Sequence, residues 1–143
     1  MLFPSREWFE AAAAALARDP LVMAANADFG QVVVGVVITR GAGLSDDFCV
    51  LVRIEPGKPF QLRYPDDEDE VAELEPDYIC WAPYAVCKSF LQTAQAGGRP
   101  DLLKAVLSGQ MKLQGDLQRV VRHGARHQGA GAATLRALPT EFV

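Results

Sequence analysis

The side chains of this sequence whose types and spacing most resemble a metal site are His123 and His127, four residues apart. Residues i and i+4 lie on the same face of an α-helix, so the two imidazoles could bind one zinc ion. The intervening Gly-Ala-Arg lacks the glutamate that acts as general base in zinc hydrolases of the His-Glu-x-x-His type, and no third ligand stands out. We therefore interpret the pair as two surface histidines near a helix end, and we predict no metal ion.

Three further side chains are candidates for nucleophilic or acid–base catalysis. Ser108 follows leucine and precedes glycine, outside the Gly-x-Ser-x-Gly pattern that presents a nucleophilic serine. Cys87 occupies an apolar position of a predicted helix, which favours a buried thiol. Asp116 precedes a helix, where an N-cap explains its carboxylate. We therefore predict that the chain is not an enzyme; a small hydrolase or isomerase that uses Asp116, His123 or Cys87 is the alternative.

The glycine-rich segments and the acidic run offer no cofactor site. Gly41-Ala-Gly43 follows a predicted strand, but Asp46 stands where a dinucleotide fingerprint has its third glycine. Gly57-Lys58 is followed by proline rather than by the Ser or Thr of a phosphate loop. The acids at 66–70 lack the glycine that bends a calcium-binding EF-hand loop, so we interpret them as a solvated loop or a helix start. We expect no cofactor.

Length and composition predict one globular domain over residues 1–143. Half of the residues are hydrophobic and 22% are charged, and a chain of this length can bury about 70% of its unfolded surface. No apolar run reaches the ~18 residues of a membrane span, and the first residues lack the basic-then-apolar layout of a signal peptide. None of Cys49, Cys80 and Cys87 stands in a Cys-x-x-Cys pair, so reduced thiols are expected. We therefore expect a soluble, cytoplasmic protein.

The net charge of −4 conceals an uneven distribution along the chain. Eight of the eighteen acids lie between Asp66 and Asp77, where there is no Lys or Arg, whereas the part from Lys104 onward is mildly basic. This basic excess is too weak to predict a nucleic-acid partner. It fits a transient contact with an anionic membrane surface, although a solvated face is the simpler interpretation. The oligomeric state stays open.

Periodicity and helix caps predict an α+β fold with five strands. Ser5 and Asp19-Pro20 are start signals for two N-terminal helices. The Val-rich residues 31–39 predict a central strand covered on both faces, and Pro56-Gly57 predicts the turn of a hairpin. Helices grouped before and after the strands are typical of helices packed on one face of a mainly antiparallel sheet. The elements expected are helices at 6–18, 20–29, 83–96, 100–107 and from 117, strands at 31–39, 48–55, 60–64, 77–82 and 110–114, and a loose C-terminal segment anchored by Leu138 and Phe142.

Residues 107–121 join the end of one helix, a short strand and the start of another helix. Gly109 can adopt the left-handed conformation that closes a helix, and Gly115 permits a sharp turn. Asp116 then caps the next helix. Met111 and Leu113 alternate with polar residues, as in a half-buried strand. We predict that the two glycines and the aspartate are structural.

The run Leu-Ser-Gly109-Gln-Met-Lys-Leu-Gln-Gly115-Asp116-Leu, after a helix that begins Pro100-Asp-Leu-Leu, resembles the sterol carrier protein 2 family. The usual form there is Gly-Lys-apolar-x-apolar-x-Gly-Asp, and Gln110 replaces the lysine here. The order of the predicted elements is similar over most of the chain. The resemblance implies a five-stranded, mainly antiparallel sheet covered by helices, with a hydrophobic tunnel that takes fatty acyl chains or sterols and performs no covalent chemistry.

The resemblance further implies a partner and a function. The expected ligand is a lipid, such as a fatty acid, an acyl-CoA or a sterol-like molecule, and the expected function is its binding and transfer inside the cell. A structural or interaction module of the same fold with a filled cavity is the alternative. From the predicted facing of the elements, the tunnel is expected to be lined by Phe48, Val50, Val52, Phe90, Val106, Met111, Leu113, Val120 and Phe142.

Overall fold

A five-stranded sheet forms the centre of the computed structural model, which describes all residues 1–143. Its strands lie in the order β4-β3-β2-β5-β6. Three of the four neighbouring pairs are antiparallel, and β2 with β5 is parallel. The predicted mainly antiparallel sheet, with the Val-rich strand at its centre, is therefore confirmed. The strands are β2 (Val32–Thr39), β3 (Phe48–Ile54), β4 (Gln61–Arg63), β5 (Tyr78–Pro83) and β6 (Lys112–Gln114).

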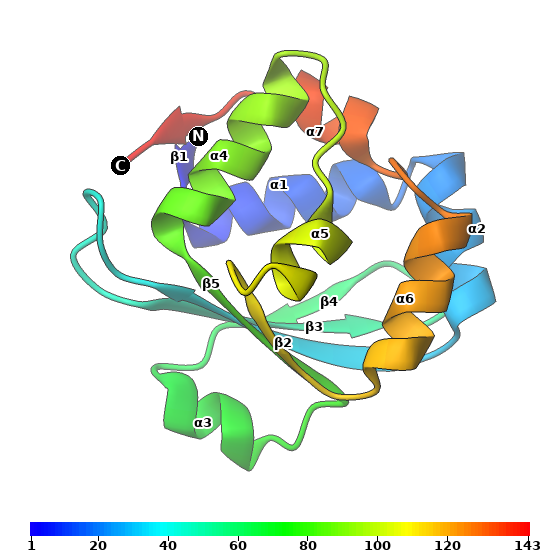
Figure 1. The fold of residues 1–143 in the computed structure, drawn as a ribbon, viewed down its shortest axis with the longest axis horizontal. Helices are drawn as coiled ribbons and strands as arrows, with labels where there is room; N and C mark the ends of the chain where they lie inside the picture. Colours follow the sequence, from blue (N-terminus) through cyan, green and yellow to red (C-terminus); the bar gives the residue numbers. More distant parts are fainter.

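Most helices lie on one side of this sheet (Figure 1). The N-caps predicted from the sequence are present, because Ser5 Oγ accepts a hydrogen bond from Trp8 N at 3.1 Å and Asp19 Oδ1 accepts one from Leu21 N at 2.9 Å. None of the helices has the length and apolar character needed to cross a membrane. The helices of this layer are α1 (Arg6–Leu16), α2 (Pro20–Phe29), α4 (Tyr84–Gln95), α5 (Leu102–Leu107) and α6 (Leu117–Arg126).

Helix α3 (Glu68–Glu73) covers the opposite face of the sheet (Figure 1), so the expectation that all helices lie on one face is wrong for this element. The acidic run starts it: Asp67 Oδ1 accepts from Glu70 N, and Glu70 Oε2 accepts from Asp66 N, each at 2.8 Å. These reciprocal bonds satisfy amides that a helix start leaves free. Val71 is completely buried against the sheet, and a Cβ at Gly35 would lie 2.6 Å from its Cγ1. Glycine at this strand position therefore lets α3 approach.

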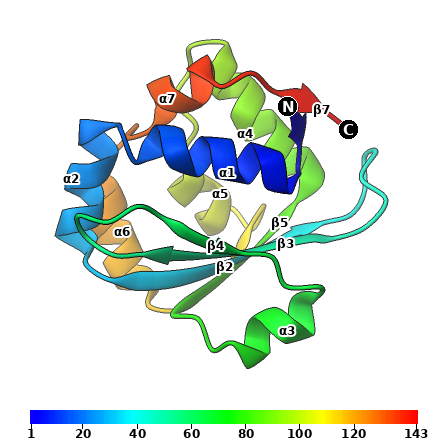
Figure 2. The same ribbon diagram turned by 180° about the vertical axis from the view of Figure 1, so that it is seen from behind.

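The C-terminal segment is ordered, and the expectation of a loose segment is wrong. It forms α7 (Ala132–Ala137) and β7 (Glu141–Phe142), and β7 pairs in parallel with β1 (Leu2–Phe3), which places the two termini side by side (Figure 2). Thr134 Oγ1 donates to Asp19 Oδ2 at 2.7 Å and ties α7 to the start of α2. The anchors Leu138 and Phe142 pack, as predicted, against a buried cluster that contains Phe3, Trp8, Ile38 and Tyr84.

The joint at 107–121 has the predicted helix–strand–helix form. Gly109 follows α5 with φ +81°, and Asp116 Oδ1 accepts from Arg119 N at 3.2 Å at the start of α6. At Gly115, with φ +135°, a Cβ would lie 2.7 Å from Cε1 of Tyr78. The Tyr78 hydroxyl donates to the Asp116 carbonyl at 3.0 Å. The ring of Tyr78 on β5 thus packs against the turn and fixes the direction in which α6 leaves the sheet.

Candidate functional site

The two faces of the sheet are packed differently. Successive side chains of a strand point to opposite faces, and the side chains beneath α3 are mostly buried. Val37, Cys49 and Ile79 form a cluster with Val71 of α3, and the half-buried Trp81 packs at its edge. This face is therefore closed where α3 covers it.

On the face that points toward the other helices Val50 has no exposed surface, but some of its neighbours at the centre of the sheet are less completely covered. Val34 lies on the central strand, where it pairs with Val52 of β3 and with Tyr78 of β5. Val34, Val52 and the next residue of this face, Val36, are nevertheless only half-buried. Because protein interiors are normally packed as densely as organic crystals, partly exposed valines in the middle of a covered sheet indicate unfilled space beneath the helices.

The helices above this face also present half-buried apolar side chains. Phe90 of α4 and Val106 of α5 pack against the sheet but keep part of their surface exposed. Helix α6 has no fully buried residue, although Val120 and Val121 are half-buried and Leu117 is 38% exposed. The apolar side of α6 is therefore only partly covered by the rest of the chain.

The nine predicted tunnel residues fall into separate groups on this side of the sheet. Phe90, Val106, Met111 and Leu113 belong to one cluster, which forms around Cys80, Ala82 and Ala105. Phe48 and Phe142 pack instead in the cluster of Trp8 and Tyr84, where Phe48 stacks on Phe9 with 5.4 Å between ring centroids. Val50 and Val52 lie on the helix-facing side of β3, and Val120 lies on α6.

A cavity of about 460 Å³ opens where the C-terminal ends of α4 and α6 meet the starts of α5 and α7. Small-molecule sites typically measure about 300–1,000 Å³. Among the predicted tunnel residues, Phe90 alone lines this cavity. The other apolar residues that line it were not predicted. The sequence signal for them was the Gly- and Ala-rich segment at 129–133, because its small side chains leave space for a cavity. The apolar walls are Phe90, Leu91, Leu102, Leu103, Ala130, Ala132 and Leu135.

A second cavity of about 470 Å³ lies on the other side of the segment that leads into α5. Phe90, Arg99, Pro100 and Asp101 line both cavities, so the two are neighbours along α4. Asp101 is occupied as the N-cap of α5, where it accepts from Lys104 N at 2.9 Å. Arg99 is exposed and free of ion pairs, and it offers a cation at the rim of both cavities.

The candidate catalytic side chains are each engaged in a structural role. Burial raises the pKa of Cys87 to about 12, so its thiol does not supply a thiolate near neutral pH. Ser108 Oγ donates to the Ala105 carbonyl at 3.3 Å at the end of α5. Asp116 caps α6. The structure thus pairs none of these three with a general base.

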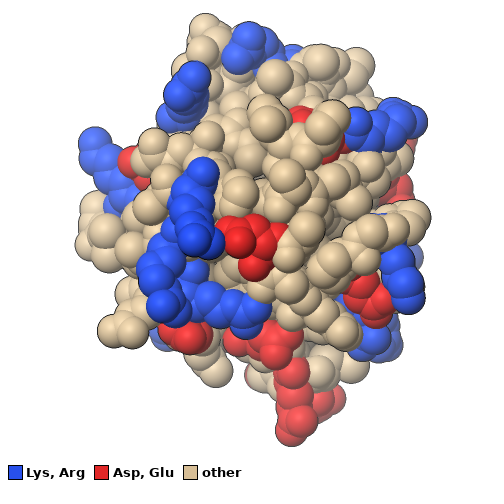
Figure 3. Space-filling view, turned by 90° about the vertical axis from the view of Figure 1, so that its right-hand side faces the viewer, with Lys and Arg blue, Asp and Glu red and all other residues tan.

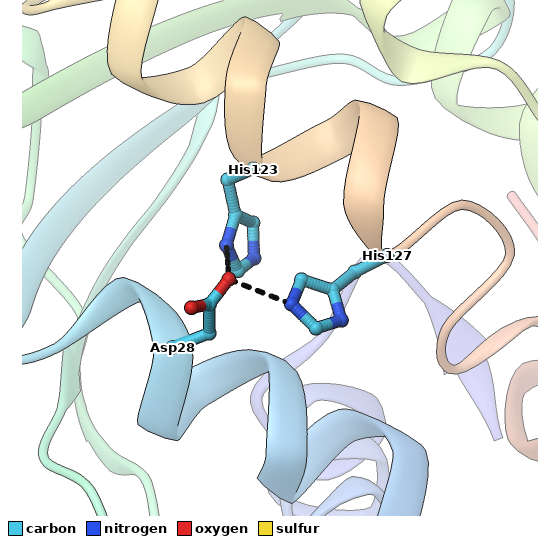
Figure 4. Close-up of side chains that lie close together, drawn as sticks. All are labelled: Asp28, His123 and His127. Atoms are coloured by element: carbon cyan, nitrogen blue, oxygen red, sulfur yellow. Dashed lines mark hydrogen bonds and ion pairs between the residues drawn. The ribbon is translucent and has the colours of Figure 1, made fainter.

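His123 and His127 lie near the end of α6, as predicted, but both are half-buried rather than at the surface, and a third side chain meets them. Asp28, in the last turn of α2, places Oδ2 2.9 Å from His127 Nε2 and 3.9 Å from His123 Nδ1 (Figure 4). Asp28 was not predicted as a partner of the histidines, because it lies 99 positions from His127 in the sequence. The available signal was an acid at a helix C-terminus, where the helix dipole disfavours negative charge.

Comparison with known proteins finds similarity in structure and not in sequence. No family model matches the chain, and no curated protein matches it. The chain superimposes on a crystal structure of sterol carrier protein 2 with a TM-score of 0.70 and 15% identity, over 94% of this chain and 98% of that one. A conserved hypothetical protein of Thermus Thermophilus, whose name suggests a sterol carrier protein, superimposes with a TM-score of 0.70 and 14% identity, over 96% and 90%.

Proposed function

We propose, on the premise that this chain has the sterol carrier protein 2 fold, that it is a single lipid-binding domain that carries a fatty acyl chain or a sterol-like molecule without chemical conversion. The observation that supports the proposal most directly is the apolar sheet face of Val34, Val36 and Val52, which stays partly exposed beneath a layer of helices. The cavity of about 460 Å³ bordered by Phe90, among the helices above this face, is where we expect the ligand to enter.

Apolar burial supplies enough free energy for such a ligand. Each buried methylene contributes ~0.8 kcal/mol, so an acyl chain of about fifteen methylenes gains ~12 kcal/mol on leaving water. This is the order of magnitude that a carrier needs to compete with a bilayer, which offers the same gain per methylene. Polar contacts of the protein need then only orient the ligand.

Arg99 is the side chain we assign to the polar end of the ligand. It lies at the rim of both cavities, exposed and without an acidic partner. A guanidinium binds a carboxylate or a phosphate through two parallel hydrogen bonds. A fatty acid or an acyl-CoA, both of which carry an anionic end, is therefore the ligand class that this rim favours.

The first test is whether the chain binds lipid at all. We expect native mass spectrometry of the protein purified from cells to reveal co-purified lipid, and the delipidated protein to bind a fluorescent fatty acid. Absence of both would remove the proposal. It would favour the alternative of an interaction module that keeps the fold with a filled interior.

The second test concerns Arg99. A hydrogen bond to a charged group contributes about 1.5–3 kcal/mol, so Arg99→Ala is expected to weaken binding of a fatty acid by about tenfold or more and to leave binding of the matching fatty alcohol unchanged. Arg18→Ala, which removes an exposed arginine between α1 and α2 that has no ion pair and lines neither cavity, is the matched control. Equal losses for acid and alcohol would contradict the role of Arg99 while leaving lipid binding itself intact.

Location and membrane contact belong to the same proposal. A carrier of this kind acts in the cytoplasm and meets membranes transiently. Lys and Arg side chains gather in a stripe over the side of the molecule formed by α2 and α6 (Figure 3). Basic residues near an anionic membrane surface contribute ~1 kcal/mol each. Transfer between vesicles is expected to accelerate when anionic lipid is added and to slow with salt, and a rate independent of both would remove the membrane step.

A further inference from the structure

We infer that Asp28, His123 and His127 form a binding site for a divalent first-row transition metal such as Zn²⁺, which joins α6 to α2. This inference is independent of the proposed lipid function. It starts from one ligand atom each of Asp28, His123 and His127, and these three atoms all lie within 4.8 Å of one another. The three side chains converge on one point between the two helices (Figure 4).

The separations fit a single ion. Zinc binds imidazole nitrogen and carboxylate oxygen at about 2.0–2.2 Å, so tetrahedral ligand atoms stand about 3.4 Å apart. The observed separations from Asp28 Oδ2, 2.9 Å to His127 and 3.9 Å to His123, lie on either side of this value. A change of about 0.5 Å in each distance would bring both to this value, and the fourth tetrahedral position would then be open to water.

His123 supplies the second, independent observation. Its Nδ1 is buried and has no hydrogen-bond partner, because 3.9 Å from Asp28 Oδ2 is too long for a hydrogen bond. A buried polar atom without a partner costs about 1–3 kcal/mol. The ring is held in this position by the edge of Phe29, with 4.9 Å between ring centroids.

Two imidazoles and one carboxylate define the class of metal. Nitrogen ligands select zinc and its neighbours in the first transition row, whereas Mg²⁺ and Ca²⁺ prefer oxygen ligands alone. The chain contains no other histidine. Cys49, Cys80 and Cys87 are reduced, and burial raises their pKa to about 11, 11 and 12, so they compete poorly for the ion.

The position of the site explains what the metal does. Helix α6 has no fully buried residue, so apolar packing alone holds it weakly. A metal shared with Asp28 ties its C-terminal end to α2. His127 also lines the cavity of about 460 Å³, so the same ion fixes part of the cavity wall.

Arg126 is the competitor for the carboxylate. Its Nη1 lies 3.2 Å from both oxygens of Asp28, and its side chain is 71% exposed. A cation at Asp28 opposes binding of a second cation there, so the guanidinium must move into solvent when the metal binds. Arg122 is an arginine of the same helix with no ion pair to Asp28, which makes it a matched control.

The experiment is a calorimetric titration of the chelator-treated full chain with ZnCl₂, and with MgCl₂ as comparison. We expect one Zn²⁺ per chain and no binding of Mg²⁺. Asp28→Asn keeps the size of the side chain, and His127→Asn keeps a hydrogen-bonding group. Loss of a residue that only hydrogen-bonds to a metal ligand already lowers metal affinity by about tenfold or more, so each variant should weaken Zn²⁺ binding by more than about tenfold. Arg126→Ala should bind Zn²⁺ more tightly than Arg122→Ala.

Measurements on the unmodified chain test the site even if a variant fails to fold. Zn²⁺ should shift the NMR signals of both imidazoles, and at a free concentration about 100 times Kd it should slow amide exchange in α6 by about 100-fold. Co²⁺ should give visible absorption without the bands of thiolate ligands. Absence of stoichiometric Zn²⁺ binding, thiolate bands with Co²⁺, or unchanged affinity in correctly folded Asp28→Asn and His127→Asn would each overturn the site.

Discussion

The same substitution on opposite faces of the central strand tests whether space remains beneath the helices. Val34 points toward the helices and is half-buried, whereas Val37 points toward α3 and has no exposed surface. Both lie on β2, so Val34→Phe and Val37→Phe change the same strand and add the same atoms. Only the packing on the two faces differs.

The magnitudes follow from this packing. Adding atoms to a filled core costs about 1–3 kcal/mol, and 1 kcal/mol shifts Tm by about 4 °C in a chain of this length. Val37→Phe is therefore expected to lower Tm by about 4–12 °C. Val34→Phe is expected to keep Tm within about 4 °C of the parent, because its ring enters space that is not filled by protein.

Lipid affinity gives the complementary readout. Phenylalanine has about four more carbon atoms than valine, and it excludes a similar length of acyl chain from the interior. At ~0.8 kcal/mol per methylene this costs ~3 kcal/mol, or a loss of affinity of about 100-fold. A thermal melt and a titration with a fluorescent fatty acid measure the two effects on each variant.

The pair of outcomes separates a carrier from a filled module. A Val34→Phe variant that loses as much stability as Val37→Phe would show that the interior is solid, and the lipid-binding proposal would fail with it. A stable Val34→Phe variant with parental affinity would show that the ligand does not reach this part of the sheet. Only stability with lost affinity agrees with the unfilled interior.

Three further predictions concern the joint and the thiols. Asp116→Ala should lower the free energy of unfolding by about 1 kcal/mol through loss of the cap on Arg119 N, with ligand binding largely intact, and an unchanged thermal melt would contradict the cap. Gly115→Ala should lower the free energy of unfolding, measured with a chemical denaturant, by about 1–3 kcal/mol or more, because Gly115 has a φ of +135° and a Cβ there would meet Tyr78. The control Gly124→Ala lies inside α6 with no atom within 4 Å of the added Cβ, and it should raise this free energy by up to about 1 kcal/mol. Burial raises the pKa of Cys87 to about 12, so its alkylation at pH 8 should be about 10³-fold slower than that of a free thiol. The alkylation rate should rise about tenfold per pH unit up to pH 10. A rate that reaches a plateau below pH 9 would refute the raised pKa.

Local signals predicted most of the fold. The caps Ser5, Asp19 and Asp116 act on amides two or three residues away, so the sequence around each contains the whole interaction. The Val-rich strand and the hairpin are likewise local patterns, and both are present as predicted.

Elements held by distant contacts were harder to predict. Helix α7 has six residues, fewer than an isolated helix needs, and it depends on Asp19 and on the Ala94 carbonyl, to which Arg136 Nε donates at 3.2 Å. Strand β7 has two residues and needs β1, from the other end of the chain. Helix α3 was predicted as a loop or a helix start because Val71 is its one buried residue.

The candidate site shows the same difference between local patterns and distant contacts. The facing of Phe48, Val50 and Val52 follows from strand periodicity, whereas the cavity depends on where α5, α6 and α7 end relative to one another. The position of Asp28 at a helix C-terminus marks it as unusual, but nothing near it in the sequence connects it to the histidines. Periodicity predicts which side of each element is apolar, but it does not determine which apolar sides face one another. That depends on how the helices are placed.

The joint at 107–121 connects these observations, because it sets the placement of α6. The Tyr78 ring fills the place of a side chain at Gly115, and the Tyr78 hydroxyl holds the Asp116 carbonyl at 3.0 Å. Since α6 buries no residue completely, this fixed start and the contacts with α2 determine where its apolar side lies. A side chain at Gly115 should therefore displace His127 and the cavity wall as well as the turn. Gly115→Ala is accordingly expected to weaken lipid and Zn²⁺ binding together, although position 115 is not among the residues that line either cavity or bind the metal.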